Sequence, residues 1–281
     1  MASLEGFDMN ALKPDALAPA EIEAKAEAVA VGKANMAAPK VFVLAMLAGA
    51  FVSFGALYFC VFLSDPTIPF AVQRVVGGLC FCLGLVLILC CGAELFTGNS
   101  LMVTALASKR IKLAAMLKNW GIVWLGNLAG SLVAIFIIVM AHIADLNGGA
   151  VGSAVISLAV SKVTPDWITL FFKGILCNVF VCLAVWIGFA ARTVTDKIIG
   201  IILPISAFVA CGFEHCVANM FFLPMGLIAK TMGYTQLVDA SALDLGAIFY
   251  NISAATLGNI VGGVIVGLAY WYVFHVRKNQ G

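Results

Sequence analysis

The chain has 281 residues, of which 63% are hydrophobic and 11% are charged, and its net charge is +2. Soluble domains carry about 25% charged residues, and the mean hydropathy here is +1.08. This composition excludes a soluble globular protein and predicts an integral membrane protein.

The first 40 residues precede the long apolar runs, and we expect them to form a cytoplasmic N-terminal segment. They lack the basic start, apolar core and small-residue cleavage site of a secretory signal, so we expect no removal. Within them, PAEIEAKAEAVAVGKANM begins at Pro19 and places Ile22, Ala26 and Lys33 at helical spacing, which predicts an amphipathic helix. Such a helix would pack on the membrane domain, or act as a gate or a partner-docking arm.

Six apolar runs follow, each long enough to cross the hydrocarbon core as a helix. They lie near residues 41–63, 75–107, 117–141, 168–190, 199–229 and 248–274. Their length and composition favour helices over a transmembrane barrel, whose strands have about 10 residues of alternating polarity. We therefore predict an all-α membrane protein with a pore domain at 41–275 and a cytoplasmic tail at 276–281.

The basic residues predict the orientation of the chain in the membrane. Twelve of the sixteen Lys and Arg fall in the N-terminal segment, the loops after the second and fourth spans, and the tail. Arg74, Lys162 and Lys230 fall in the opposite loops, and Lys173 lies within the fourth span. The positive-inside rule therefore places both termini in the cytoplasm.

The nine cysteines lie within apolar runs, and none forms a CxxC pair. We interpret them as small buried hydrophobic residues. The sequence also has no zinc, haem or iron–sulfur spacing, no P-loop and no GxGxxG fingerprint. These observations argue against ATP-driven pumping and nucleotide redox chemistry, and we expect no metal and no cofactor.

Two pairs of segments recur along the chain. CGAELFTGN at 91–99 matches CGFEHCVAN at 211–219, and GNLAG at 126–130 matches GNIVG at 258–262. The pairs divide the chain into two halves of three spans each. Because an odd number of spans reverses the direction of insertion, the halves are predicted to form an inverted 3+3 repeat.

The second and fifth spans are too long for one straight helix. At 1.5 Å per residue each would extend about 50 Å, against about 30 Å of hydrocarbon. A polar cluster in the middle of each predicts a broken helix at a midplane site. We expect the carboxylates of Glu94 and Glu214 to accept the backbone N–H groups that the breaks free, with Asn99 and Asn219 beside them.

His215 has no counterpart in the first repeat, where Leu95 stands, and Thr97 corresponds to Val217. Ionisable residues inside a bilayer mark substrate or proton pathways by default. Because an imidazole is neutral or cationic near neutral pH, we expect His215 to attract an anion, to donate a proton to it, or to do both, with the Thr97 hydroxyl orienting the ring. The alternative is an interhelical hydrogen bond that only packs the bundle.

The signature segments of the formate/nitrite transporter family resemble five stretches of this chain, GGLCFCLGLVLILCCGAELFTGNSL, KNW…GNLAG, KGILCNVFVCLAVW, LPISAFVACGFEHCVANMFFLPMG and GNIVGG. The resemblance extends from about Pro39 to His275. It implies an aquaporin-like fold, a homopentamer in the bacterial inner membrane, and one pore per protomer for formate and other small monovalent anions. No enzymatic activity and no nucleic-acid partner are expected.

The resemblance also implies roles for single residues, with His215 as the central pore histidine and Thr97 as its partner. The other matched positions are Leu95, Phe96 and Val181 at a cytoplasmic constriction, Phe81, Leu85 and Phe208 at a periplasmic one, and Asn178 and Asn259 beside the lumen. Lys162, in an outer loop, corresponds to a vestibule lysine that draws anions. From the residues alone, the apolar positions would be assigned to the core or to the lipid.

Other functions stay open at this stage. Nitrite and hydrosulfide are the main alternatives to formate, and acetate and lactate have similar size and charge. A membrane enzyme or electron carrier that uses the cysteines and His215 is a different class. It is disfavoured because no second histidine or acid lies at metal-ligand spacing.

Overall fold

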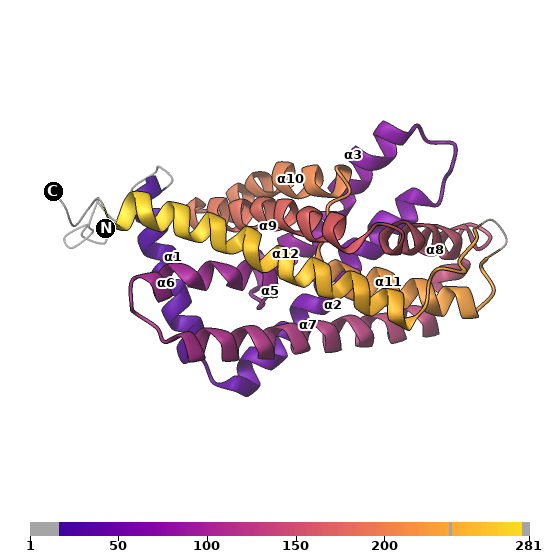
Figure 1. Cartoon of the computed structure of the whole chain (residues 1–281). Coiled ribbons are helices and arrows are strands. Elements are labelled where there is room, and N and C mark those ends of the chain that lie inside the picture. The colour runs from indigo at the N-terminus through magenta and orange to yellow at the C-terminus, as the bar shows by residue number, and fades with distance from the viewer. Residues whose placement is uncertain (1–16, 236–237, 277–281) are drawn as a thin grey trace, which may run out of the picture.

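The computed structural model describes residues 17–235 and 238–276. The start of the N-terminal segment and nearly all of the tail predicted at 276–281 lie outside the described residues. Within them the chain is helical, with no strand. The α-helices are α1 (Pro19–Asn35), α2 (Ala38–Leu63), α3 (Phe70–Phe81), α4 (Leu83–Cys91), α5 (Phe96–Asn99), α6 (Val103–Ala107), α7 (Leu113–Met140), α8 (Ala150–Val163), α9 (Trp167–Ala190), α10 (Val194–Ala210), α11 (Cys216–Thr231) and α12 (Leu245–Trp271) (Figure 1).

Several of these helices are long and apolar enough to cross a membrane, which confirms the predicted class. The five stretches that meet this condition in the described chain are Ala38–Leu63, Phe70–Cys91, Leu113–Met140, Trp167–Ala190 and Leu245–His275. The span predicted at 199–229, which is expected to be broken, is divided between α10 and α11. A short 3₁₀ turn, η2 (Ser100–Met102), joins α5 to α6, and a second one, η3 (Ile143–Asp145), follows α7.

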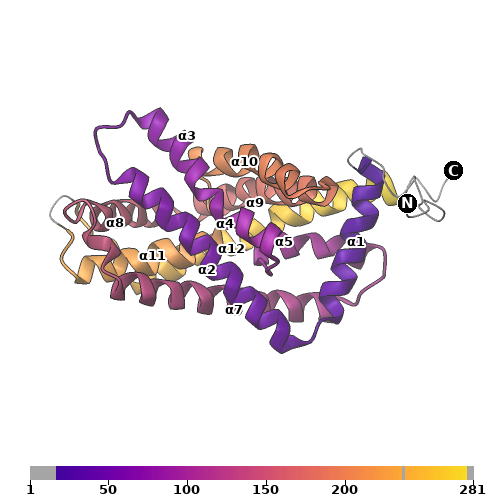
Figure 2. The same cartoon turned by 180° about the vertical axis from the view of Figure 1, so that it is seen from behind.

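The helices form an elongated bundle. α2 packs along α7, and α9 packs along α12. α1 crosses one end of the bundle, where it contacts α6 and the π-helical turn η4 (Tyr272–Val276), whereas α8 lies at the other end against α11 (Figures 1 and 2). As predicted, α1 begins at Pro19, and its buried residues Ile22 and Ala26 face the bundle.

Glycines in the two repeated GN segments let the long helices touch. A Cβ atom on Gly130 of α7 would lie 1.9 Å from the backbone oxygen of Met46, and one on Gly262 of α12 would lie 2.3 Å from that of Ile175. Any side chain there would force the helices apart. Small residues at such crossings let helix backbones approach closely.

The prediction that all nine cysteines are buried is wrong for three of them. Cys90 is half-buried, and Cys91 and Cys211 are exposed. Cys91 is the last residue of α4, and Cys211 follows the last residue of α10. Both exposed cysteines therefore lie where the chain leaves a packed helix, a position that local hydropathy does not reveal.

Candidate functional site

Two interruptions in the helices shape the centre of the molecule. α4 ends one residue before Gly92, which has φ +83°, and α5 begins at Phe96. α10 ends two residues before Gly212, which has φ +69°, and α11 begins at Cys216. Positive φ is strained for residues with a Cβ atom, so these two glycines make the sharp exits from α4 and α10 possible.

Asn127 of α7 holds the first interruption. Its side-chain amide donates to the backbone oxygens of Ala45 and Glu94 at 2.8 and 2.9 Å. Its Oδ1 accepts the backbone N–H of Phe96 at 2.9 Å. One fully buried side chain thus satisfies two backbone groups at the interruption, on Glu94 and Phe96, and ties them to α2 through the oxygen of Ala45.

Asn259 of α12 does the same at the second interruption. Its amide donates to the backbone oxygens of Gly174 and Glu214 at 2.8 and 2.9 Å, and its Oδ1 accepts the N–H of Cys216 at 2.9 Å. The resemblance implied a place for Asn259 beside the lumen. In the structure its amide group bonds to the backbone in a fully buried position, and the place beside the lumen stays a prediction.

The expectation that Glu94 accepts freed backbone N–H groups is wrong. Its carboxylate accepts from the Lys33 ammonium at 2.8 Å and from the Asn99 amide at 2.7 Å. The amide of Asn99 also donates to Asn119 at 2.9 Å. Because Asn127 already serves the backbone here, the buried carboxylate is left to pair with a cation from α1, and such pairing is what makes its burial tolerable.

The same correction applies to Glu214. Its carboxylate accepts from the Lys162 ammonium at 3.2 Å, from Asn219 at 2.6 Å and from Asn251 at 3.2 Å. Lys162 is not an exposed loop residue, as the sequence predicted, but lies on α8 and is 8% exposed. The run AVSKV forms the end of a helix because α8 packs against α11, a tertiary contact that local sequence does not report.

His215 is the N-cap residue of α11. Its Nδ1 accepts the backbone N–H of Ala218 at 3.0 Å, and its Nε2 lies 3.0 Å from the Thr97 hydroxyl. Because Nδ1 is an acceptor, the geometry assigns a neutral imidazole with its hydrogen on Nε2. Leu95 holds the corresponding N-cap position before α5 and has no side-chain cap, so the site is asymmetric.

A cavity of about 330 Å³ opens beside His215. Phe81 and Phe208, two of the predicted outer-constriction residues, lie on its wall together with Lys162. The ring of Phe208 stacks on the imidazole of His215 at 5.9 Å and meets the edge of Phe81 at 5.7 Å. The two aromatic rings and the imidazole thus lie side by side on the wall of one cavity.

Three further residues on this wall were not among the predicted site residues. Arg74 donates to the backbone oxygens at the end of α10, and Lys173 of α9 is half-buried. Phe222 stacks with Phe81 at 6.3 Å and lies 5.6 Å from the Lys162 ammonium. Arg74 and Lys173 are charged residues in or beside apolar runs of the sequence. Their positions in the sequence served only to predict the orientation of the chain in the membrane.

The remaining predicted pore residues are buried in the bundle. Leu95 and Phe96 flank the first interruption, and Val181 lies on α9. Asn178 donates to the backbone oxygen of Thr97 at 3.2 Å. Leu85 of α4 is buried too, but it is not on the wall of the cavity beside His215.

Four residues that hold the interruptions were missed as site residues, namely Lys33, Asn119, Asn127 and Asn251. The repeat contained a signal for one of them. The match of GNLAG with GNIVG aligns Asn127 with Asn259. The other three lie outside the matched segments.

Known proteins match this chain over most of its length. The formate/nitrite transporter family profile matches residues 20–272. The formate channel FocA of Escherichia coli (strain K12) is 38% identical over 277 residues, which cover 95% of this chain and 97% of that protein. A solved pentameric formate channel with formate bound has a TM-score of 0.77 and 34% identity over 85% of this chain and 98% of its own. A solved FNT family ion channel has a TM-score of 0.79 and 31% identity over 90% of this chain and 98% of its own.

Proposed function

Because the chain belongs to the formate/nitrite transporter family, we propose that it is a transmembrane channel for formate and similar small monovalent anions. The observation that carries this proposal is the buried contact between Thr97 and His215, each at the N-terminal end of a helix that follows an interruption. Helix N-termini favour negative charge, and two of them meet here. Family members are channels and transporters, not enzymes.

The proposed architecture is six crossings in an aquaporin-like inverted 3+3 repeat, with the second and fifth crossings broken. The matched contacts support it: Asn127 and Asn259 bind equivalent backbone groups, and Lys33 and Lys162 bind equivalent glutamates. The two lysines come from α1 and α8, at opposite ends of the bundle (Figure 2). A two-fold axis in the membrane plane relates the two halves of an inverted repeat, so equivalent residues of the halves lie at opposite ends of the bundle.

The proposed assembly is a homopentamer in the bacterial inner membrane with both termini in the cytoplasm. A solved relative of 34% identity is a pentameric formate channel, which supports the assembly. The distribution of Lys and Arg supports the orientation. The contact between α1 and η4 brings the N-terminal helix and the end of α12 to one end of the bundle, which supports an even number of crossings.

The proposed anion path begins in the cavity beside His215. Lys162, Lys173 and Arg74 line it and attract anions by their charge. The anion then passes Phe81 and Phe208 to reach Thr97 and His215. Beyond the site we place the inner constriction at Leu95, Phe96 and Val181, which are apolar and buried.

At the site, we assign His215 the task of lending a proton to the anion. A bare charge crosses an apolar constriction at a penalty of several kcal/mol, and a neutral acid avoids most of it. The resting imidazole is neutral, so the proton must reach His215 together with the anion, whose charge stabilises the cationic ring. Once Nδ1 carries a hydrogen, it can no longer accept the backbone N–H of Ala218, so this capping hydrogen bond would break. Anion conduction and formate–proton symport become two outcomes of one site.

Uptake into proteoliposomes tests the proposed substrate. Radiolabelled formate should enter vesicles that contain the protein, faster than empty vesicles, and unlabelled formate should compete more strongly than nitrite or hydrosulfide. Stronger competition by nitrite or hydrosulfide would reassign the substrate within the family. No uptake of any of the three anions would contradict the channel function.

A further inference from the structure

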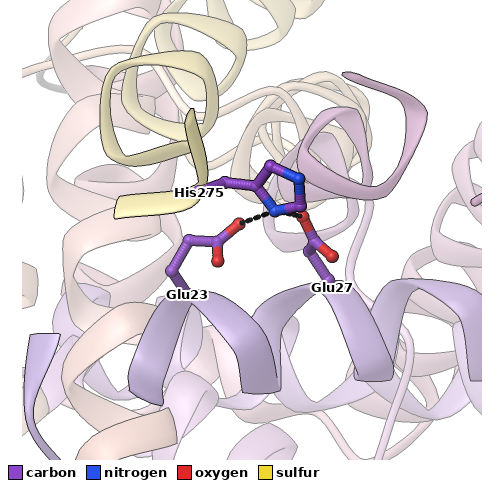
Figure 3. Close-up of side chains that lie close together, drawn as sticks. All are labelled: Glu23, Glu27 and His275. Atoms are coloured by element: carbon purple, nitrogen blue, oxygen red, sulfur yellow. Dashed lines mark ion pairs between the residues drawn. The ribbon is translucent and has the colours of Figure 1, made fainter. Parts of the chain in front are cut away.

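A cluster of three metal-ligating side chains lies away from the pore. Glu23 and Glu27 lie one turn apart on α1, and His275 lies on η4 after α12; Figure 3 shows both carboxylates directed toward the imidazole. The Nδ1 atom of His275 is 3.0 Å from Glu27 Oε1 and 4.0 Å from Glu23 Oε1. One ligand atom from each residue lies within 4.8 Å of the others.

We propose that Glu23, Glu27 and His275 form a binding site for a divalent transition-metal ion of the zinc type. Carboxylate oxygen and imidazole nitrogen are ligands of such ions, and three protein ligands with one open position are common. With metal–ligand bonds of about 2.1 Å, ligand atoms around a tetrahedral ion lie about 3.4 Å apart. The present separations of 3.0 and 4.0 Å bracket that value.

The surroundings of the cluster suit an ion. Glu23 and Glu27 are buried, at 3% and 4% exposure, and buried carboxylates are tolerated where they are paired or coordinate a metal ion. A cavity of about 280 Å³ opens onto all three side chains, which leaves room for water as a fourth ligand.

Neighbouring side chains orient the ligands, as outer partners do in metal sites. Arg110 contacts the Oε2 atom of Glu27 at 3.2 Å, and the Ser108 hydroxyl donates to the Oε1 atom. Trp271 donates to the same hydroxyl at 2.8 Å and stacks on the His275 ring at 5.8 Å.

A bound ion would join two distant parts of the chain. α1 carries Lys33, which pairs with Glu94 at the first interruption, and η4 ends the last long helix. The ion would therefore hold α1 in the position in which Lys33 reaches the interruption. This site is independent of the anion path, so its test does not depend on transport.

Calorimetric titration of tag-free, chelator-stripped protein with Zn²⁺ tests the site. We expect one ion per protomer, and weaker binding of Mn²⁺ in a parallel titration. Glu23→Gln and His275→Gln should each lower the Zn²⁺ affinity at least tenfold, whereas His275→Cys should keep binding because a thiolate is also a zinc ligand. The matched control is His142→Gln, which removes an exposed histidine beside Asp145.

Hydrogen exchange provides a second readout. Zn²⁺ should slow exchange of the α1 backbone amides in the wild type and in His142→Gln, but not in Glu23→Gln or His275→Gln. Absence of saturable binding to the wild type would overturn the proposal, and His275 would then be only an ion-pair partner of the two glutamates. Equal binding by the wild type and both ligand variants would overturn it as well.

Discussion

At the scale of single residues, His215 has a structural role as a helix cap and a proposed role in anion transit. It caps α11 through Nδ1 and contacts Thr97 through Nε2. Asparagine is among the best N-cap residues, and its side chain neither gains nor loses a proton. A substitution at this position can therefore remove proton donation and keep the helix cap.

We expect His215→Asn to keep the cap and a thermal midpoint close to that of the wild type. Anion conduction should persist, but formate accumulation driven by external acid should be lost, because asparagine cannot lend a proton to the anion. Fluorescent pH measurement and formate uptake in the same proteoliposomes check this. His215→Leu is the control that also loses the cap, at a cost of about 0.5–2 kcal/mol. Acid-driven accumulation in His215→Asn equal to that of the wild type would rule out His215 as the proton donor.

Lys162 and Lys173 line the same cavity but differ in their partners. Lys162→Met leaves the carboxylate of Glu214 buried without its cation, and breaking a buried pair in this way costs about 3–5 kcal/mol. We expect a lower thermal midpoint and reduced formate uptake at every ionic strength, with the midpoint largely restored by adding Glu214→Gln. This expectation differs from that for an exposed loop lysine, whose effect salt would screen.

Lys173→Gln is the matched variant, since this half-buried lysine lies on the cavity wall. Its loss should weaken uptake mainly at low ionic strength, because the Debye length falls to about 10 Å at 0.1 M salt. Formate uptake measured across a salt series distinguishes the two lysines. Identical salt dependence in both variants would contradict the separate roles.

At the scale of helices, the close approach of α7 to α2 depends on glycine at one position and not at another. Gly130→Ala would place a Cβ atom 1.9 Å from the Met46 oxygen, whereas Gly121→Ala meets nothing within 4 Å on the same helix. We expect Gly130→Ala to destabilise the fold by about 1–3 kcal/mol through overpacking. Gly121→Ala should be neutral or stabilising by up to about 1 kcal/mol. Thermal unfolding in detergent of the two variants checks the contrast, and equal midpoints would contradict it.

At the scale of the whole molecule, the apolar surface requires a cover. Phe136, Leu203 and Phe249 are 65%, 76% and 76% exposed on the isolated chain. Surface of this kind is stable against lipid or against neighbouring protomers, and not in water. The isolated chain therefore requires lipid or neighbouring protein around it.

We expect native mass spectrometry of the purified protein to give five chains per particle. A monomer or a trimer would contradict the proposed pentamer. Reporter fusions at the C-terminus should be active only in the cytoplasm, and periplasmic activity would contradict the proposed orientation. The first experiment tests the family resemblance and the second tests the charge distribution, so they fail independently.

The sequence alone determined the membrane class and the regions of the two interruptions. Hydropathy is a sum over neighbouring residues, and each of the paired CG…N segments is nine residues long. Both patterns can therefore be recognised from residues that are close together in the sequence. The family followed from such stretches too, and with it the pairing of Thr97 with His215. No contact between distant elements had to be known for these conclusions.

Only the tertiary structure decided how the interruptions are held. Glu94 pairs with Lys33, 61 positions away, and Glu214 pairs with Lys162, 52 positions away. These contacts depend on how α1 and α8 pack, and no local pattern encodes that packing. The buried state of Lys162 and the cluster of Glu23, Glu27 and His275 have the same origin, because burial and ligand geometry arise only when distant helices meet.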